Sequence, residues 1–216
     1  DRAWIYYGLR RGGDAIYAMD VSNPDSPALK WVIDSSTPGF DEMVMTFSAP
    51  VIGVVQYGAA NKKEVVVFGG GYLGGGSGTT GRTGYDVYDN NGTDTGVAKF
   101  TDDNGDPLPR KGNAVYVVDA DTGALIWKVA QNSDATLPGG AVRYANSGLV
   151  HSIAAPVPLV DTNGDRVDDR AYVPDMGGNV WRIDLPRSAS SDNRSTWQAV
   201  KIAALGNGAA GGSNDR

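Results

Sequence analysis

The residues best suited to chemistry lie in one acidic segment, residues 161–169, which reads DTNGDRVDD. Oxygen-bearing side chains recur at positions 1, 3, 5 and 9 of this segment, and a backbone carbonyl is available at position 7. A hard divalent cation such as Ca²⁺ needs about six oxygen ligands, and a curling chain can turn alternate residues toward it. The spacing therefore predicts a calcium site with these ligands: Asp161, Asn163, Asp165, the carbonyl of Val167, and Asp169.

This spacing matches the first nine positions of an EF-hand loop, but the segment departs from that motif. Position 12 is Tyr172 where a bidentate Glu is expected, and no flanking helices are predicted. Position 6 is Arg166 instead of Gly, so the sharp turn there costs roughly 1 kcal/mol. The loop is expected to join strands at 157–160 and 170–173. The alternative reading is an ordinary Asp/Asn/Gly turn.

Two similar acidic stretches are weaker candidates. Residues 102–106 repeat the DxNGD pattern, but Arg110 stands at position 9, where a carboxylate is needed. Residues 89–92 match still less of it. Both are predicted to be solvated turns.

A repeated unit of strands must position the acidic loop. Residues 113–129, NAVYVVDADTGALIWKV, alternate like a strand, turn at Asp-Thr-Gly and end in a second strand with Trp127. Residues 14–33 repeat this pattern, with Trp31 in the place of Trp127. A third copy begins at 179–185 and closes at 197–203. The aromatic residue of the first strand recurs as Tyr17, Tyr116 and Trp181, and the Asp that ends it as Asp20, Asp119 and Asp184.

Each copy follows another strand and a glycine corner, and residues 48–52 and 154–158 match as innermost strands. The sequence thus predicts an all-β fold, a β-propeller of four-stranded antiparallel blades, with an EF-hand-like loop that lacks helices. The whole chain, 1–216, is assigned to part of one propeller domain. Its blades are placed at about 1–34, 46–130 and 150–204. Three blades cannot close a ring, so the chain is interpreted as a fragment. A solenoid or sandwich of the same strands is the alternative.

The second blade carries a long insertion at 71–111, which is rich in Gly, Asp and Asn and has no apolar period. Such a segment is expected to be a surface loop that is dispensable for folding and acts, if at all, in contacts.

The run VDTNGDRVDDRAYVPDMGGNVWRIDL, residues 160–185, resembles the C-terminal propeller of the PilC/PilY proteins of type IV pili. In that family a nine-residue calcium loop leads into a strand, a Pro-Asp or Gly-Asp corner and a Gly-Asn-x-Trp-Arg-x-Asp-Leu strand. Carried over residue by residue, the resemblance gives the same five calcium ligands.

The resemblance also implies a non-enzymatic, extracytoplasmic protein in the periplasm, at the outer membrane or at the pilus tip on the cell surface. It implies roles in pilus assembly, retraction control, twitching motility and adhesion. Pilins or minor pilins, and a host or surface ligand, are the implied partners.

Two other functions compete with this interpretation. One is a scaffold or binding propeller outside the pilus system. The other is a pyrroloquinoline-quinone dehydrogenase, suggested by residues 120–127, although the vicinal cysteine pair common in those enzymes is absent because the chain has no Cys. His151 is the only histidine and is expected to be structural, and the chain holds no nucleophilic triad or zinc ligand set. A net charge of −6 argues against nucleic-acid binding, and no apolar run is long enough for a membrane span.

Overall fold

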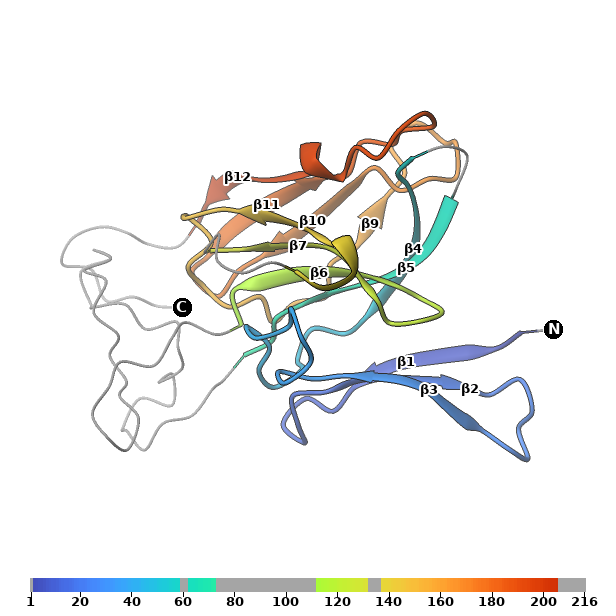
Figure 1. Ribbon diagram of the computed structural model, residues 1–216. Coiled ribbons are helices and arrows are strands. Elements are labelled where there is room, and N and C mark those ends of the chain that lie inside the picture. Colours follow the sequence, from blue (N-terminus) through green and yellow to red (C-terminus); the bar gives the residue numbers. More distant parts are fainter. Residues whose placement is uncertain (1, 59–61, 73–111, 132–136, 206–216) are drawn as a thin grey trace, which may run out of the picture.

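The computed structural model describes residues 2–58, 62–72, 112–131 and 137–205. These residues form three β-sheets that follow one another in chain order, with a five-stranded sheet between a three-stranded and a four-stranded sheet (Figure 1). The only helices in these ranges are two 3₁₀ turns, η1 (Pro138–Gly140) and η2 (Arg194–Thr196). Neither has the length or apolarity to cross a bilayer. The all-β prediction is confirmed, while closure of such sheets into a propeller stays a prediction.

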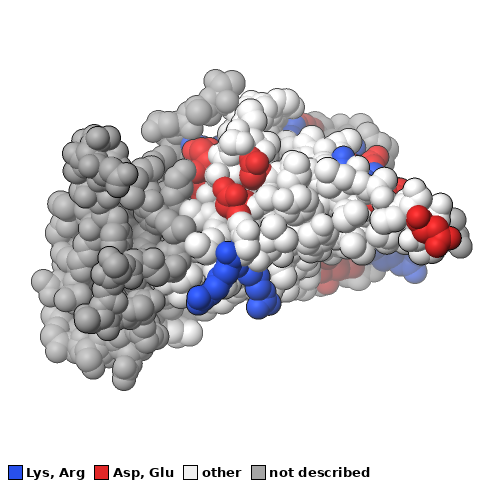
Figure 2. Space-filling model, turned by 90° about the horizontal axis from the view of Figure 1, so that it is seen from below, with Lys and Arg blue, Asp and Glu red and all other residues white. Residues whose placement is uncertain are grey.

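The three-stranded sheet consists of β1 (Trp4–Gly8), β2 (Ile16–Asp20) and β3 (Ala28–Ile33), all antiparallel. One face packs against the five-stranded sheet through Ile16, Ala18, Trp31 and Ile33. The opposite face carries exposed Ile5, Leu29 and Val32 and the stacked rings of Tyr7 and Tyr17. Figure 2 views the molecule from the side on which this sheet lies, and the surface there is largely uncharged.

The five-stranded sheet is built from β4 (Val51–Gln56), β5 (Lys62–Gly69), β6 (Ala114–Asp119), β7 (Leu125–Ala130) and β8 (Val142–Ala145). Its first four strands are antiparallel, as predicted, but β8 pairs with β7 in parallel. The expectation of a four-stranded, purely antiparallel unit is therefore wrong here. The connection through η1 carries the chain back along β7, so that a fifth strand covers its edge.

The four-stranded sheet contains β9 (Leu159–Val160), β10 (Arg170–Pro174), β11 (Asn179–Asp184) and β12 (Gln198–Ala204). All its pairings are antiparallel. Its edge strand β9 has only two residues and lies after 154–158, where an innermost strand was predicted. Pro156 and Pro158 have no N–H to donate to a ladder, which accounts for the shorter strand.

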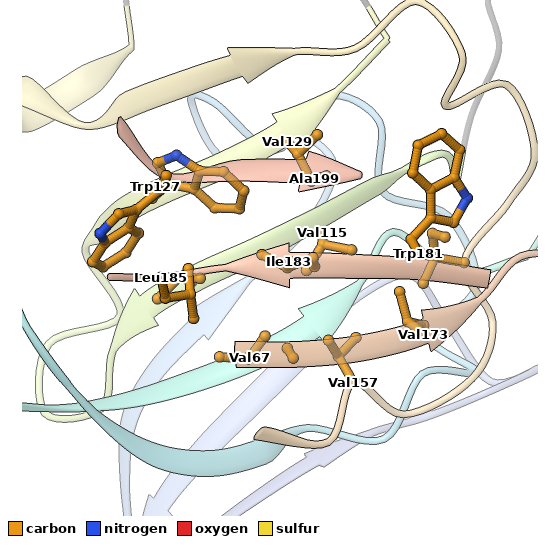
Figure 3. Close-up of a cluster of buried hydrophobic side chains, with 14 of the residues drawn as sticks. Val67, Val115, Trp127, Val129, Val157, Val173, Trp181, Ile183, Leu185 and Ala199 are labelled. Atoms are coloured by element: carbon orange, nitrogen blue, oxygen red, sulfur yellow. The ribbon is translucent and has the colours of Figure 1, made fainter. Parts of the chain in front are cut away.

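The five-stranded sheet is buried on both faces, and this explains the continuous apolar run in β5. Val65 and Val67 join the cluster shared with the four-stranded sheet, whereas Val66 and Phe68 join the cluster shared with the three-stranded sheet. Figure 3 shows the first cluster, in which Trp127 lies opposite the strands of the four-stranded sheet. Trp127 and Trp197 meet edge to face, with ring centroids 6.0 Å apart.

Residues 73–111 of the predicted insertion lie outside the described residues, but both of its ends are described. Gly71 donates its N–H to the carbonyl of Ile153 (3.0 Å), and Gly112 donates to the carbonyl of Glu42 (2.6 Å). Both glycines have positive φ, 96° and 82°. The backbone on either side of the insertion is therefore fixed to the segments that connect neighbouring sheets.

Candidate metal centre

The acidic loop 161–169 connects β9 to β10 at the edge of the four-stranded sheet. Its anchor is Val167, whose side chain is 1% exposed. On either side of the loop the backbone is tied to its own sheet, because Asp169 donates its N–H to Val160 (3.1 Å) and accepts one from Leu185 (2.8 Å). The polar residues of the loop are thus held at a fixed place on a rigid sheet.

Asp161 organises the first half of the loop. Its Oδ1 accepts backbone N–H groups from Asn163 (3.2 Å), Gly164 (2.7 Å) and Asp165 (3.3 Å), and its Oδ2 accepts that of Arg166 (2.7 Å). Burial acts to raise the pKa of Asp161, but these N–H groups, that of Arg166 foremost, lower it below the ordinary 3.8. The aspartate at position 1 is therefore held as a carboxylate that folds the chain around itself.

The next two predicted ligands continue the same turn. Asn163 Oδ1 accepts the N–H of Asp165 (2.9 Å), and Asp165 Oδ1 accepts that of Val167 (2.9 Å). Asp165 Oδ2 forms an ion pair with Arg187, which follows β11. Arg166, where an EF-hand has glycine, adopts φ 65° in the left-handed region. The loop therefore makes the sharp turn that its spacing predicts, at the expense of strain at an arginine.

Asp169, the last predicted ligand, binds inside the loop. Both of its carboxylate oxygens accept the hydroxyl of Thr162, at 2.8 and 2.7 Å, which brings the two ends of the loop together. Asp161, Asn163 and Asp165 thus share one turn and Asp169 closes it. Within the described ranges, however, no three acidic or histidine side chains are grouped in a metal-holding arrangement.

The loop residues fit calcium by donor chemistry, since every predicted ligand offers oxygen. Each predicted carboxylate ligand accepts a protein hydrogen bond or forms an ion pair, so coordination needs these side chains to turn from their present partners. The calcium assignment stays a prediction. Asp168, to which the ligand spacing gives no role, instead contacts the neighbouring sheet, and nothing in the sequence pattern signals that contact.

The other candidate residues lie elsewhere. The acidic stretches 89–92 and 102–106 fall outside the described residues. His151 packs closely on Gly177, where a Cβ atom would lie 2.1 Å from the imidazole Cδ2. This contact leaves no room for a side chain at position 177, so the histidine and the glycine corner fit one another.

The turn that suggested a quinone enzyme is used for packing between sheets. Asp119 Oδ1 caps it by accepting the N–H groups of Asp121 (2.9 Å) and Thr122 (3.0 Å). Trp31 from the three-stranded sheet donates its indole N–H to Ala120 (3.1 Å). Its ring lies so close to Gly123, φ 73°, that a Cβ there would be 2.9 Å away. Tryptophan docking on this corner holds two sheets together.

These features define an all-β protein in which mainly antiparallel sheets stack through docked tryptophans and an acidic loop joins two strands at one sheet edge. No family model matches the chain. It is similar to the type IV pilus biogenesis factor PilY1 of Pseudomonas aeruginosa strain UCBPP-PA14, with 28% identity over 199 residues. It is also similar to a PilY1 homologue of Xylella fastidiosa strain Temecula1, with 25% identity over 209 residues.

These matches cover 91% and 95% of this chain but 13% and 11% of the two relatives. The crystal structure of the C-terminal domain of P. aeruginosa PilY1 has a similar fold, with a TM-score of 0.54 at 23% identity. That match covers 91% of this chain and 32% of the crystallised one. The resemblance to the PilC/PilY proteins is confirmed: over most of its length this chain is similar to part of PilY1.

Proposed function

We propose that the chain is an extracytoplasmic, calcium-binding part of a type IV pilus biogenesis factor. In this proposal it supports pilus assembly, retraction control and surface adhesion, with pilins or minor pilins and a surface ligand as partners. The observation that carries the proposal is the similarity to PilY1 over 91% of the chain. The names of the matched relatives describe a biogenesis factor, and the fold offers scaffold-like packing between sheets.

The calcium part of the proposal is supported by the balance of charge in the loop. Four carboxylates lie within residues 161–169, at positions 161, 165, 168 and 169. In the described part of the chain, the cation that pairs with them is Arg187, on Asp165. Because unbalanced negative charges on one short loop repel one another, a divalent cation would supply the missing positive charge. Asp161, Asn163, Asp165, the carbonyl of Val167 and Asp169 would hold it.

Calorimetric titration of the purified chain with Ca²⁺ tests the site directly. We expect one site per chain, and we expect Asp165→Ala to weaken binding at least about tenfold because it removes a ligand and a charge. Asp25→Ala, in the exposed turn between β2 and β3, is the matched control and should bind like the wild type. Equal heats from the wild type and Asp165→Ala, or no heat from either, would contradict the calcium assignment.

The pilus part of the proposal is tested in cells with the full-length protein that contains this chain. Loop closure around a cation would bias the protein between states that support and release pili, because a ligand shifts an equilibrium by its differential affinity for two states. Asp161→Ala should therefore change surface piliation or twitching motility at unchanged protein level. Asp165→Lys, which places a fixed cation in the loop, should imitate the bound state. Normal piliation and motility of both variants at every calcium concentration would reject this role.

A further inference from the structure

Asp168 joins the acidic loop to a different sheet from the one that carries it. Its Oδ2 accepts the backbone N–H of Val54 at 2.8 Å, and its own N–H donates to the carbonyl of Val54 at 2.7 Å. Val54 belongs to β4, in the five-stranded sheet, whereas the loop lies between β9 and β10 of the four-stranded sheet. One residue of the loop thus satisfies both backbone groups of one residue in the neighbouring sheet.

Gly53 provides the space for this contact. A Cβ atom at position 53 would lie 2.6 Å from Asp168 Oδ2 and 2.2 Å from Leu159 Cδ1, closer than real Cβ contacts come. Gly53 does not have positive φ, so glycine is not needed here for its backbone conformation. It is needed because a side chain would prevent the loop from packing against β4. The pair Gly53 and Asp168 is therefore matched across the two sheets.

A second contact supports the first. Lys62, the first residue of β5, donates from Nζ to the backbone carbonyl of Asp165 at 3.2 Å. Residues 165 and 168 of the loop are thus bonded to two adjacent strands of the five-stranded sheet. Between them lies Val167, whose buried side chain leaves the segment little freedom to move independently of those strands.

We propose that Asp168 is a positioning residue that couples the conformation of the loop to β4, so that a change in the loop alters the junction of the two sheets. The identity of calcium as the effector rests on the proposed function, but the coupling itself does not. A cation-induced rearrangement of residues 161–169 acts on the hydrogen bonds of Asp168 to Val54, because the predicted ligands and Asp168 belong to one short, anchored segment. The signal then reaches a strand outside the sheet that carries the loop.

Amide hydrogen exchange of the whole chain measures this coupling at the Val54 N–H. Without calcium, Asp161→Ala removes the acceptor of four loop N–H groups, and we expect Val54 exchange to rise about fivefold although position 161 does not touch it. Asp168→Ala should raise the exchange rate of the Val54 N–H about tenfold. The variant that carries both Asp161→Ala and Asp168→Ala should exchange less than twofold faster than Asp168→Ala alone. Asp168→Asn, which keeps an acceptor oxygen, should stay within about threefold of the wild type.

Ca²⁺ alone is the second probe. In the wild type it should slow exchange both in the loop and at Val54, whereas in Asp168→Ala it should protect the loop only. The coupling is overturned if Asp161→Ala leaves Val54 unchanged, if the two substitutions act additively, or if calcium protects Val54 equally in Asp168→Ala. If calcium protects nothing in the wild type, the proposed calcium site fails, and the metal-free cycle of Asp161 and Asp168 variants still decides the coupling.

Discussion

Two regions of this molecule surround their carboxylates differently: Glu42 is neutralised by protein cations, whereas the loop 161–169 has more carboxylates than paired cations among the described residues. This contrast distinguishes carboxylates that stabilise the fold from carboxylates that are available to a ligand. Glu42, in the connection between the three-stranded and five-stranded sheets, is surrounded by protein cations and donors. Its Oε2 accepts from Lys128 Nζ (2.6 Å) and the Tyr116 hydroxyl (2.9 Å), and its Oε1 from Arg143 (3.1 Å). The loop 161–169 has four carboxylates and, in the described part of the chain, one paired cation.

The two regions also differ in exposure. The side chain of Lys128 is 0% exposed, that of Arg143 8% and that of Glu42 13%, so their electrostatic interactions are weakly screened. Asp165 and Arg187 keep 27% and 45% of their side-chain surface in water. With Asp41, which also pairs with Lys128, the Glu42 network holds two carboxylates and two cations, and such a balanced network stabilises one arrangement. The more exposed, unbalanced loop can gain a cation at lower desolvation cost. The Glu42 cluster is therefore assigned to the fold, and the loop stays the proposed site of cation binding.

The largest effect is expected where a buried charge loses its partner. Lys128→Met keeps most of the side-chain volume but removes one of the two cations that neutralise Glu42, and Arg143 alone remains. We expect a loss of about 3 kcal/mol in the free energy of unfolding, measured by denaturant titration. Arg2→Met breaks the pair of Arg2 with Glu64, in which both side chains are more than half exposed, and should cost less than about 1 kcal/mol. Equal losses in the two variants would remove the distinction between the regions.

The same chemical change, carboxylate to amide, sharpens the comparison. Glu42→Gln should lower the unfolding free energy by about 2 kcal/mol, with or without calcium, because Lys128 then lacks its closest counter-charge. Asp165→Asn should change it by less than about 0.5 kcal/mol without calcium, since its pair with Arg187 is exposed.

Calcium distinguishes the two variants further. At a hundredfold excess over Kd the wild type and Glu42→Gln should gain about 2.7 kcal/mol, and Asp165→Asn should gain much less. Denaturant titrations in calcium and in chelator measure the unfolding free energy with and without the metal, and their difference is the gain. A calcium-dependent gain that survives in Asp165→Asn would place the binding site elsewhere.

How well the sequence predicts each region depends on how far apart in the chain the interacting residues lie. Alternation and turn residues predicted most strands and the Asp-Thr-Gly turn, against which Trp31 packs. The burial of Lys128, by contrast, is not visible in the sequence, where Lys128 is a single polar residue within a strand. It is buried because it pairs with Glu42, 86 positions away. The ligand spacing of the acidic loop is local and visible in the sequence.

The contact of Asp168 with Val54 spans 114 positions and leaves no periodic trace. The parallel strand β8 escaped prediction because a run of four residues is too short to indicate a strand by its pattern alone. The contacts between sheets that the sequence did not reveal therefore join distant segments, and these contacts set how the sheets meet.

The smallest expected effects are those of pH, and they have opposite signs in the two regions. Burial, with the nearby charge and hydrogen bond of Glu42, raises the pKa of Tyr116 well above 10. A raised pKa means that the folded state favours the neutral phenol, so this contribution to stability is complete below about pH 10 and is lost as pH rises above it. The lowered pKa of Asp161 has the reverse consequence: its contribution is present above the ordinary value of 3.8 and is lost as pH falls through the folded-state pKa.

Unfolding free energies measured across both pH limits test this. Tyr116→Phe should flatten the alkaline limb and leave the acid limb unchanged. Asp161→Asn should flatten the acid limb and leave the alkaline slope unchanged, and loop amides should lose protection, relative to their intrinsic exchange rates, as pH falls below 3.8 in the wild type alone. Tyr6 and Tyr57 also have raised pKa values through burial, so Tyr116→Phe should reduce the alkaline slope without abolishing it. An acid limb that is identical in the wild type and Asp161→Asn would mean that the backbone N–H groups around Asp161 do not stabilise its charge. In that case the loop would be folded by its anchors at Val167 and Asp168, and not by the carboxylate at its first position.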